Sequence, residues 1–338
     1  MIHQGLEFHG IDFVDEINDS GGWHLRRLPP EVHRHLNPGA KFQYLTPAGA
    51  EIRFVPTGKG SVKLTLSSLD AEPVQVSILW GGFAELESFT IETEPTVIKL
   101  TLPERFSAVT GEARASMSFC PRVCRVVLPT FGKVAFHKAE GDFRLPLQEE
   151  KPQRRAIFYG TSITHGASAT RPYLAWASLL SRWLGMDCLN YGTAGSCHIE
   201  PEMSDFIAGR SDWDLAVFCI SVNLVGDFKP AHLFAERTRY LLGTCLAAHP
   251  KKPIVAFSPL PWWPDFCPGS EDYKALCDQY RTVLQSIGEE LTSPNLHIFH
   301  GPDLLRDVTG LTTDLLHPSD LGMIEIAKRL EEKLRLLV

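Results

Sequence analysis

The stretch AIFYGTSITHG, residues 156–166, decides how this sequence is interpreted. Its apolar run AIFY is typical of a strand buried on both faces, and Gly160 and Gly166 permit a tight turn directly after it. In an open parallel sheet, functional side chains lie where the strands end. Ser162 occupies that place, either as a nucleophile or as a small polar turn residue, and this stretch alone leaves both interpretations open.

Downstream of this stretch, apolar strands alternate with helical patterns to the end of the chain. Further strands are predicted within residues 187–192, 214–223, 253–260 and 296–301, and helices within 172–185, 232–250, 270–291 and 318–337. Strands that read as continuous apolar runs between helices predict a parallel sheet covered on both faces. The fold class of this part is therefore α/β.

Upstream, from residue 40 to 145, the hydrophobic pattern has a period of two. Short alternating runs predict strands at residues 41–45, 50–55, 61–69, 73–80, 87–92, 96–102, 124–130 and 133–138. With no convincing amphipathic helix between them, they favour an antiparallel β-sandwich of the jelly-roll type, around which the first 40 residues are expected to wrap. The polar segment 144–156 has the composition of a linker, so the predicted domains are 1–150 and 151–338.

Composition excludes several classes of function. The chain of 338 residues carries 33 Lys and Arg against 40 Asp and Glu, with no basic cluster that would bind nucleic acid. The N-terminus lacks the pattern of a secretory signal, and no apolar run approaches the roughly 18 residues of a membrane span, so a soluble, cytoplasmic protein is expected. The eight cysteines are widely spread, which predicts reduced thiols and no metal site.

A base for Ser162 is offered by TTDLLHPSD, residues 312–320. Asp314 and His317 lie three apart, a spacing that lets a carboxylate orient an imidazole whose other nitrogen faces a serine. Taken alone, Asp314 could equally cap a turn, and His317 could be one of 13 ordinary histidines. His165 is a weaker candidate base, because it would have to fold back within the turn of Ser162.

Acyl transfer also needs donors for a developing oxyanion. The backbone N–H groups of Ser162 and Gly195 and the amide of Asn223 are candidates, since each follows a predicted strand. Singly, Gly195 and Asn223 are typical turn residues. Their common position at strand ends is what favours a shared site.

Together, these blocks resemble the SGNH hydrolases, the GDSL-like esterase family, over roughly residues 154–338. The matching blocks are GTSIT with Ser162, NYGTAG with Gly195, SVN with Asn223 and DLLHP with Asp314 and His317. The resemblance implies a flavodoxin-like sheet, a Ser-His-Asp triad and an oxyanion hole made by Ser162, Gly195 and the Asn223 side chain.

Two departures weaken assignment to the broad lipase subgroup. Thr161 stands where many members have aspartate, and the third block reads SVNL in place of Gly-x-Asn-Asp. The preceding β-sandwich resembles a smaller subgroup that includes carbohydrate acetylesterases and natural-product acyltransferases.

The predicted function is a serine esterase that removes a short acyl group from a carbohydrate or other small polar alcohol, without a cofactor. The alternatives are an acyltransferase with the same triad and a glycan-binding protein with an idle hydrolase domain. Trp262 and Trp263 are expected to line the substrate pocket or a subunit interface, and His198 to line the pocket or to fill a loop. The sequence leaves the formation of a homo-oligomer open.

Overall fold

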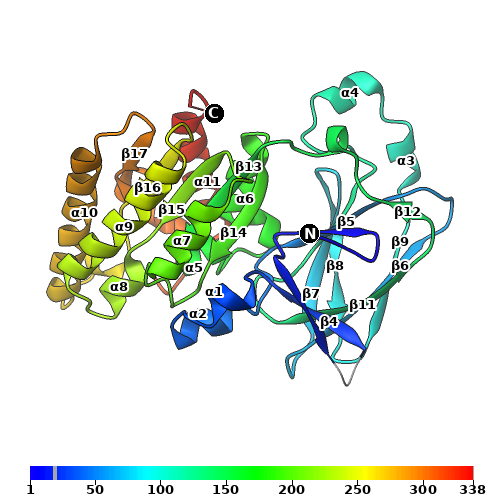
Figure 1. Cartoon of the computed structure of the whole chain (residues 1–338), viewed down its shortest axis with the longest axis horizontal. Coiled ribbons are helices and arrows are strands. Elements are labelled where there is room, and N and C mark those ends of the chain that lie inside the picture. The colour runs from blue at the N-terminus through cyan, green and yellow to red at the C-terminus, as the bar shows by residue number, and fades with distance from the viewer. Residues whose placement is uncertain (18–20, 338) are drawn as a thin grey trace.

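The computed structural model describes residues 1–17 and 21–337, which form two bodies side by side (Figure 1). The first body holds two antiparallel sheets and the second one parallel sheet with its helices. This confirms the predicted fold class. Within the described residues, no helix combines the length and apolar character needed to cross a membrane.

The parallel sheet has five strands in the order β14-β13-β15-β16-β17. Their bounds are β13 Arg155–Gly160, β14 Asp187–Gly192, β15 Leu215–Cys219, β16 Ile254–Phe257 and β17 Leu296–Phe299. In the register of the sheet, Gly160 lies opposite both Gly192 and Cys219. Three neighbouring strands therefore end at the same level, and the loops that follow them begin side by side.

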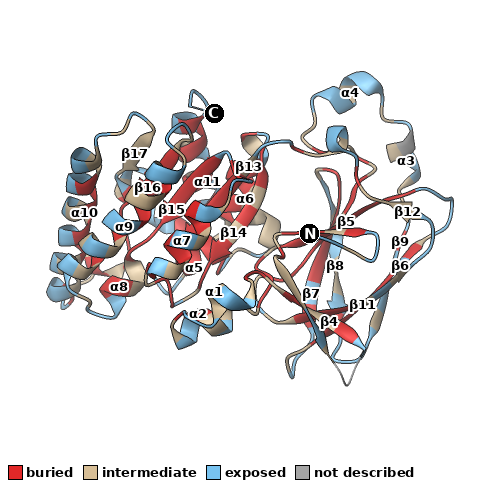
Figure 2. Ribbon diagram, viewed as in Figure 1, coloured by how far each residue is buried: buried red, intermediate tan, exposed pale blue. Residues whose placement is uncertain are grey.

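Helices cover both faces of this sheet, which explains why its central strands read as unbroken apolar runs. All five residues of β15 are buried (Figure 2). One face packs against α6 and α11, and the other against α7, α9 and α10. The helix bounds are α5 Ser162–His165, α6 Trp176–Trp183, α7 Pro201–Gly209, α8 Val222–Gly226, α9 Ala231–Ala248, α10 Glu271–Leu291 and α11 Asp320–Leu334.

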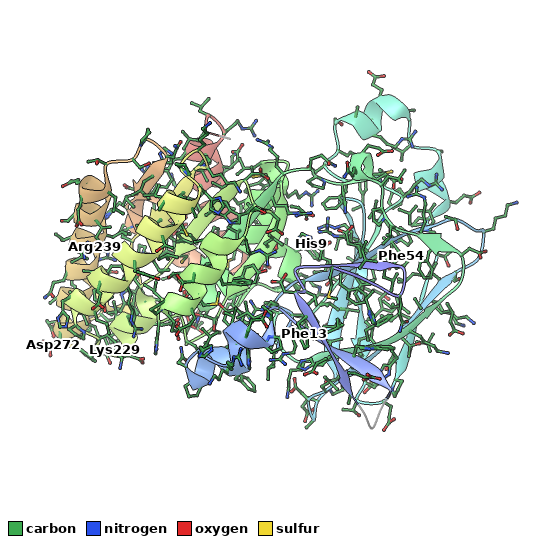
Figure 3. The ribbon with its side chains drawn as sticks, viewed as in Figure 1. His9, Phe13, Phe54, Lys229, Arg239 and Asp272 are labelled. Carbon is green, nitrogen blue, oxygen red and sulfur yellow. The ribbon has the colours of Figure 1, made fainter. Side chains whose placement is uncertain are left out.

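The antiparallel body is a sandwich whose two sheets share one core. One sheet has the order β1-β2-β5-β10-β7-β8 with β12 beside β5, and the other β3-β4-β11-β6-β9. Phe54 and Ile78 of the first sheet pack in the same core as Leu64 and Phe136 of the second, and Figure 3 labels Phe54 within this body.

The strands of the sandwich are β1 Ile2–His3, β2 Leu6–His9, β3 Phe13–Ile17, β4 Gly22–Arg26, β5 Glu51–Pro56, β6 Val62–Ser68, β7 Val74–Trp80, β8 Phe83–Ile91, β9 Thr96–Leu100, β10 Cys124–Val127, β11 Val134–Glu140 and β12 Phe143–Arg144. Its short helices are α1 Pro30–His33, α2 Pro38–Gln43, α3 Glu104–Ser107 and α4 Gly111–Ala115. The predicted division at residues 150 and 151 falls between β12 and β13.

The predicted strand at residues 41–45 is wrong, because helix α2 occupies most of this segment. The Asn37 side chain caps the helix by accepting a hydrogen bond from Ala40 N (2.9 Å), and Pro38 takes the first helical position. These two start signals outweigh the alternating pattern. The first 40 residues also do more than wrap the sandwich, since they supply β1 to β4 of its sheets.

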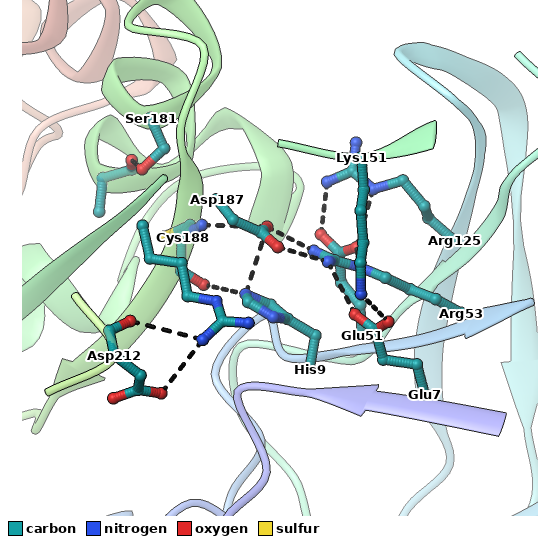
Figure 4. A network of polar contacts seen from close by, with 12 residues as sticks. Glu7, His9, Glu51, Arg53, Arg125, Lys151, Ser181, Asp187, Cys188 and Asp212 are labelled. Carbon is teal, nitrogen blue, oxygen red and sulfur yellow. Dashed lines mark hydrogen bonds and ion pairs between the residues drawn. The ribbon is translucent and has the colours of Figure 1, made fainter. Parts of the chain in front are cut away.

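A buried ionic cluster joins the two bodies (Figure 4). Arg53 of β5 is fully buried, and its guanidinium donates to both carboxylate oxygens of Asp187 (2.6 and 2.7 Å), at the start of β14. Glu51 accepts from Arg53 (2.7 Å) and from Arg125 (2.8 Å). The outward face of β5 is therefore as buried as its inward face, which explains why the whole strand is inaccessible.

This cluster should make the stability of the protein sensitive to acid. Burial alone would raise the pKa of Glu51, but Arg125 and Arg53 outweigh it and lower the pKa from 4.5 to about 2. Between these values the unfolded chain binds more protons than the folded protein. The stabilisation is complete above pH 4.5 and is lost as the pH falls toward 2, a loss of about 3 kcal/mol.

We expect Glu51→Gln to lower the free energy of unfolding at pH 7 by about 3 kcal/mol, because it removes the carboxylate partner of Arg125 and one of the carboxylates around the buried Arg53. Urea titrations between pH 7 and 2.5 measure this, with Glu94→Gln, an exposed glutamate between β8 and β9, as the control. The variant should also lose part of the acid dependence. Parallel pH profiles for wild type and Glu51→Gln would contradict the assignment.

Candidate active site

Ser162 is the first residue of α5, directly beyond strand β13, and is buried. The tight passage from strand to helix requires glycine at the strand ends. A Cβ atom at Gly160 would lie 2.2 Å from the Cys219 carbonyl oxygen, and one at Gly192 would lie 2.1 Å from His165 N. The turn predicted around residues 160–166 thus brings α5 and Ser162 close to the carboxyl end of the sheet.

The structure brings together three of the predicted residues in a hydrogen-bonded chain. Ser162 Oγ lies 2.8 Å from His317 Nε2, and His317 Nδ1 lies 2.6 Å from Asp314 Oδ2. An ionised carboxylate accepts only, so Nδ1 of the ring carries the proton and donates it to Asp314. Nε2 of the neutral ring is then free to accept from the serine hydroxyl.

The Asp314 carboxylate is held by its own loop. Its Oδ1 accepts hydrogen bonds from Thr312 Oγ1 (2.7 Å), Leu316 N (2.9 Å) and His317 N (3.0 Å). Burial would raise the pKa of Asp314, but the bonds from His317 and these further donors outweigh it and hold the pKa well below 3.8. Sequence reasoning did not identify Thr312, because a threonine two residues before an aspartate carries no special signal.

The loop that carries Asp314 and His317 is closed by hydrogen bonds between its own ends. Thr312 N donates to the His317 carbonyl (2.8 Å), and Leu311 and Pro318 form an isolated antiparallel bridge. Leu315 adopts φ +55° between the two functional residues. Left-handed backbone at this point turns the chain sharply, which lets residues three apart face each other.

Of the candidate oxyanion donors, Gly195 lies on the loop after β14 and Asn223 lies in α8, which follows β15. Asn223 Oδ1 accepts from Cys197 N (3.1 Å), so the side-chain amide is oriented with its Nδ2 as the free donor. Gly195 adopts φ +65° and is exposed, which leaves its surroundings open to a ligand. Ser221 adopts φ +127°, a conformation that favours glycine, at the position where the family motif has glycine.

His165 is not placed to act as the base. Its Nδ1 lies 3.0 Å from the Gly192 carbonyl oxygen and its Nε2 lies 2.8 Å from that of Thr130, while the ring stacks on Phe131. Burial, followed by the charge of Arg27, lowers the pKa of His165 to about 3, so the ring is neutral. His165 joins α5 to Thr130 and Phe131, which follow β10 of the sandwich.

The two tryptophans predicted to line the pocket differ in their exposure. Trp262 is only 4% exposed and packs in the core, whereas Trp263 retains exposed surface. Trp263 N donates to the Leu315 carbonyl (2.7 Å), which places this residue beside the loop of Asp314 and His317. Of the pair, Trp263 is the one that can meet a ligand.

His198 follows Cys197 on the loop that also carries Gly195. Its Nε2 lies 2.9 Å from Asp227 Oδ2, beyond the end of α8. Both side chains keep solvent-accessible surface, 21% for His198 and 48% for Asp227. A role for His198 in binding substrate stays a prediction.

One group of metal-ligating side chains, Glu7, His9 and Asp187, lies close together within the described residues. It does not fit a metal ion, since the Arg53 guanidinium already lies against both carboxylates (3.3 Å to Glu7) and supplies the positive charge. Figure 4 shows Arg53 in this position. The group belongs to the ionic cluster between the bodies.

Several solved structures share both parts of this fold. The salicylyl-acyltransferase SsfX3 from a tetracycline biosynthetic pathway is 17% identical, with a TM-score of 0.78 over 98% of this chain and 95% of its own. A family two carbohydrate esterase from Clostridium thermocellum, solved with cellohexaose, is 15% identical, with a TM-score of 0.62 over 98% and 99%. An acetyl xylan esterase from Butyrivibrio proteoclasticus is 13% identical, with a TM-score of 0.56 over 100% and 96%. At these identities the likeness concerns the fold.

Comparison with curated protein sequences gives no significant match. The sequence profile of the family described as GDSL-like Lipase/Acylhydrolase matches residues 153–335, more than half of the chain. This span contains Ser162, Gly195, Asn223, Asp314 and His317, so the resemblance inferred from four short blocks is confirmed. The chain belongs to the GDSL-like lipase/acylhydrolase family of carboxylic ester hydrolases.

Proposed function

We propose that this chain is a serine esterase that removes a short acyl group, acetyl in the first instance, from a carbohydrate or another small polar alcohol. The observation that carries the proposal is the continuous chain from Ser162 Oγ through His317 to Asp314, with distances of 2.8 and 2.6 Å. The acetyl and carbohydrate parts are supported by the substrates named for the structural relatives.

In the proposed reaction, Ser162 Oγ attacks the ester carbonyl carbon while His317 Nε2 takes the hydroxyl proton. Asp314 stabilises the imidazolium through the hydrogen bond at Nδ1. The negative charge on the former carbonyl oxygen is met by the N–H groups of Ser162 and Gly195 and by Asn223 Nδ2. His317 then protonates the leaving alcohol, and a water molecule activated by the same ring releases the acid from Ser162.

A second candidate is transfer of the acyl group to an alcohol in place of water. Its support is the shared two-part fold of the salicylyl-acyltransferase. The two functions have the same acyl-enzyme and differ in what enters next. Product analysis separates them: incubation of an acyl donor with a polyol or glycoside acceptor yields free acid in one case and a new ester in the other.

We also propose a cytoplasmic location. All eight cysteines are free thiols, and most are buried, which suits a reducing compartment.

The first expected result concerns the nucleophile. Ser162→Ala should reduce hydrolysis of nitrophenyl acetate by about 10³-fold or more, because no other group supplies the attacking oxygen. Nitrophenyl acetate, butyrate and octanoate are compared at matched folded concentration, and the acetate should be the best substrate. Ser286→Ala, on the exposed side of α10, is the control. Activity retained in Ser162→Ala would exclude the proposed nucleophile.

The second expected result concerns the groups that stabilise the oxyanion. Asn223→Ala should lower turnover by about 10² to 10³ with little change in KM, because the lost bond forms only as charge develops on the oxygen. Asn295→Ala, at the opposite end of the sheet before β17, is the matched control. If turnover survives in Asn223→Ala, Asn223 does not hold the oxyanion.

The third expected result concerns recognition of the alcohol part of the ester. Trp263→Ala should raise KM for an acetylated cello- or xylo-oligosaccharide and leave nitrophenyl acetate hydrolysis unchanged, because an indole ring offers a flat apolar surface to a sugar. Steady-state kinetics with both substrates measure this. Equal effects on the two substrates would show that the tryptophan supports the loop of Leu315 and does not recognise the alcohol.

A further inference from the structure

Arg27 is a buried cation that has no carboxylate partner among the residues the structure describes. Its side chain is 1% exposed, and all its hydrogen bonds go to backbone carbonyl oxygens. Burial lowers the pKa of Arg27 to about 10, so it stays charged at neutral pH. Burying a charge that only carbonyl dipoles stabilise costs folding free energy. The backbone groups that Arg27 holds therefore indicate what this cost achieves.

The guanidinium joins the N-terminal segment, which is residues 27–46 with helices α1 and α2, to the carboxyl end of strand β14. Nη1 donates to the carbonyls of Asn190 (3.0 Å) and Gly192 (2.8 Å), at the end of the strand. Nη2 donates to Gln43 O (2.9 Å), the last residue of α2, and Nε donates to Thr46 O (2.7 Å), three residues further along the chain. The planar fork of an arginine suits several acceptors at fixed angles, which a lysine could not reach together.

The strand end held by Arg27 leads directly into the loop of Gly195. Gly192 is also where the nucleophile helix is anchored, since its carbonyl lies 3.0 Å from His165 Nδ1. One carbonyl oxygen therefore meets both Arg27 and the helix that begins at Ser162.

The same N-terminal segment also contacts the loop that carries Gly195. Asn37 Nδ2 donates to the Ser196 carbonyl (3.0 Å), and a Cβ at Gly39 would lie 2.5 Å from Ser196 Oγ. Tyr44, whose ring lies 4.8 Å from the Arg27 guanidinium, donates its hydroxyl to Tyr191 O (2.8 Å). Figure 1 shows α1 and α2 at the junction of the two bodies, beside the parallel sheet.

We propose that Arg27 is a positioning residue of the oxyanion hole. By fixing the Asn190 and Gly192 carbonyls, it sets the direction of the Gly195 loop and its distance from Ser162. The inference rests on the proposed function, because it gives Gly195 and Ser162 the roles stated there. It assigns to the N-terminal segment a part in the rate of the reaction, in addition to its part in the fold.

Arg53 provides a matched control. It is also a fully buried arginine that holds β14 from the sandwich side, but it acts at Asp187, the opposite end of the strand from the active site. Loss of either side chain should lower stability. Only loss of Arg27 should change the rate of the folded enzyme.

The test compares Arg27→Ala, Arg27→Lys and Arg53→Ala at equal folded concentration. Arg27→Ala should lower kcat for nitrophenyl acetate by about tenfold to a hundredfold with KM unchanged, since a small displacement of reacting groups costs this much. Guanidinium chloride far below unfolding concentrations should restore part of kcat, whereas sodium chloride should not. Arg27→Lys should retain less activity than wild type, and Arg53→Ala should show a lower melting temperature with kcat unchanged.

A fluorophosphonate probe separates failure of this inference from failure of the proposed function. In labelling, Ser162 Oγ forms a bond to phosphorus, fluoride leaves, and the serine proton passes to His317. If Ser162 of the wild type is not labelled, the result contradicts the proposed function. If the wild type is labelled and folded Arg27→Ala is labelled at the same rate with the same kcat, Arg27 has only a structural role and the inference is overturned.

Should Arg27→Ala fail to fold, Arg27→Lys and Tyr44→Phe carry the test. Tyr44→Phe removes only the hydroxyl that holds the Tyr191 carbonyl. Reduced kcat and slower labelling in these folded variants support the positioning role. Wild-type values in both exclude it.

Discussion

Two buried guanidinium groups hold the two ends of edge strand β14, the strand whose carboxyl end leads into the loop of Gly195. Arg53 binds the Asp187 carboxylate where the strand begins, and Arg27 binds the Gly192 carbonyl where it ends. An edge strand has neighbouring backbone groups on one side only. Here Arg53 of the sandwich and Arg27 bind backbone and side-chain groups of this strand from the other side, so the two bodies are joined along β14.

The two arginines differ in what balances their charge. Arg53 faces carboxylates whose ionisation the cluster favours, a stable arrangement of buried charges. Arg27 faces only carbonyl dipoles, and it shares one of these oxygens with His165 of the nucleophile helix. The arginine that is paired with carboxylates lies at the start of β14, away from Ser162, and the arginine without a carboxylate partner lies at the end of the strand, close to the nucleophile candidate.

The register of the parallel sheet explains how the candidate site residues come together. Neighbouring parallel strands β13, β14 and β15 end in register, which brings Ser162, Gly195 and Asn223 to the same end of the sheet. The acid and base come from one closed loop that leads into α11, and Asp314 is held by bonds from within that loop. Ser162 and His317 became candidates because four short blocks, each open to another interpretation when taken alone, occur in the order and at the strand ends that the family resemblance implies. The helix at 38–43 and the burial of Trp262 were not predicted, because a cap at Asn37 and packing against Tyr273 override the local pattern.

The sequence by itself determined the two sheet types and their order along the chain, since hydrophobic periodicity is encoded within short segments, and it selected Ser162, Asp314 and His317 as candidates for a triad. Only the tertiary structure decided which tryptophan stays accessible, which way the Asn223 amide points and what Arg27 and Arg53 bind. These contacts join residues as far apart as Arg27 and Gly192, 165 positions along the chain. No local pattern specifies the partner of a buried charge, because that partner is selected by the packing of the whole fold.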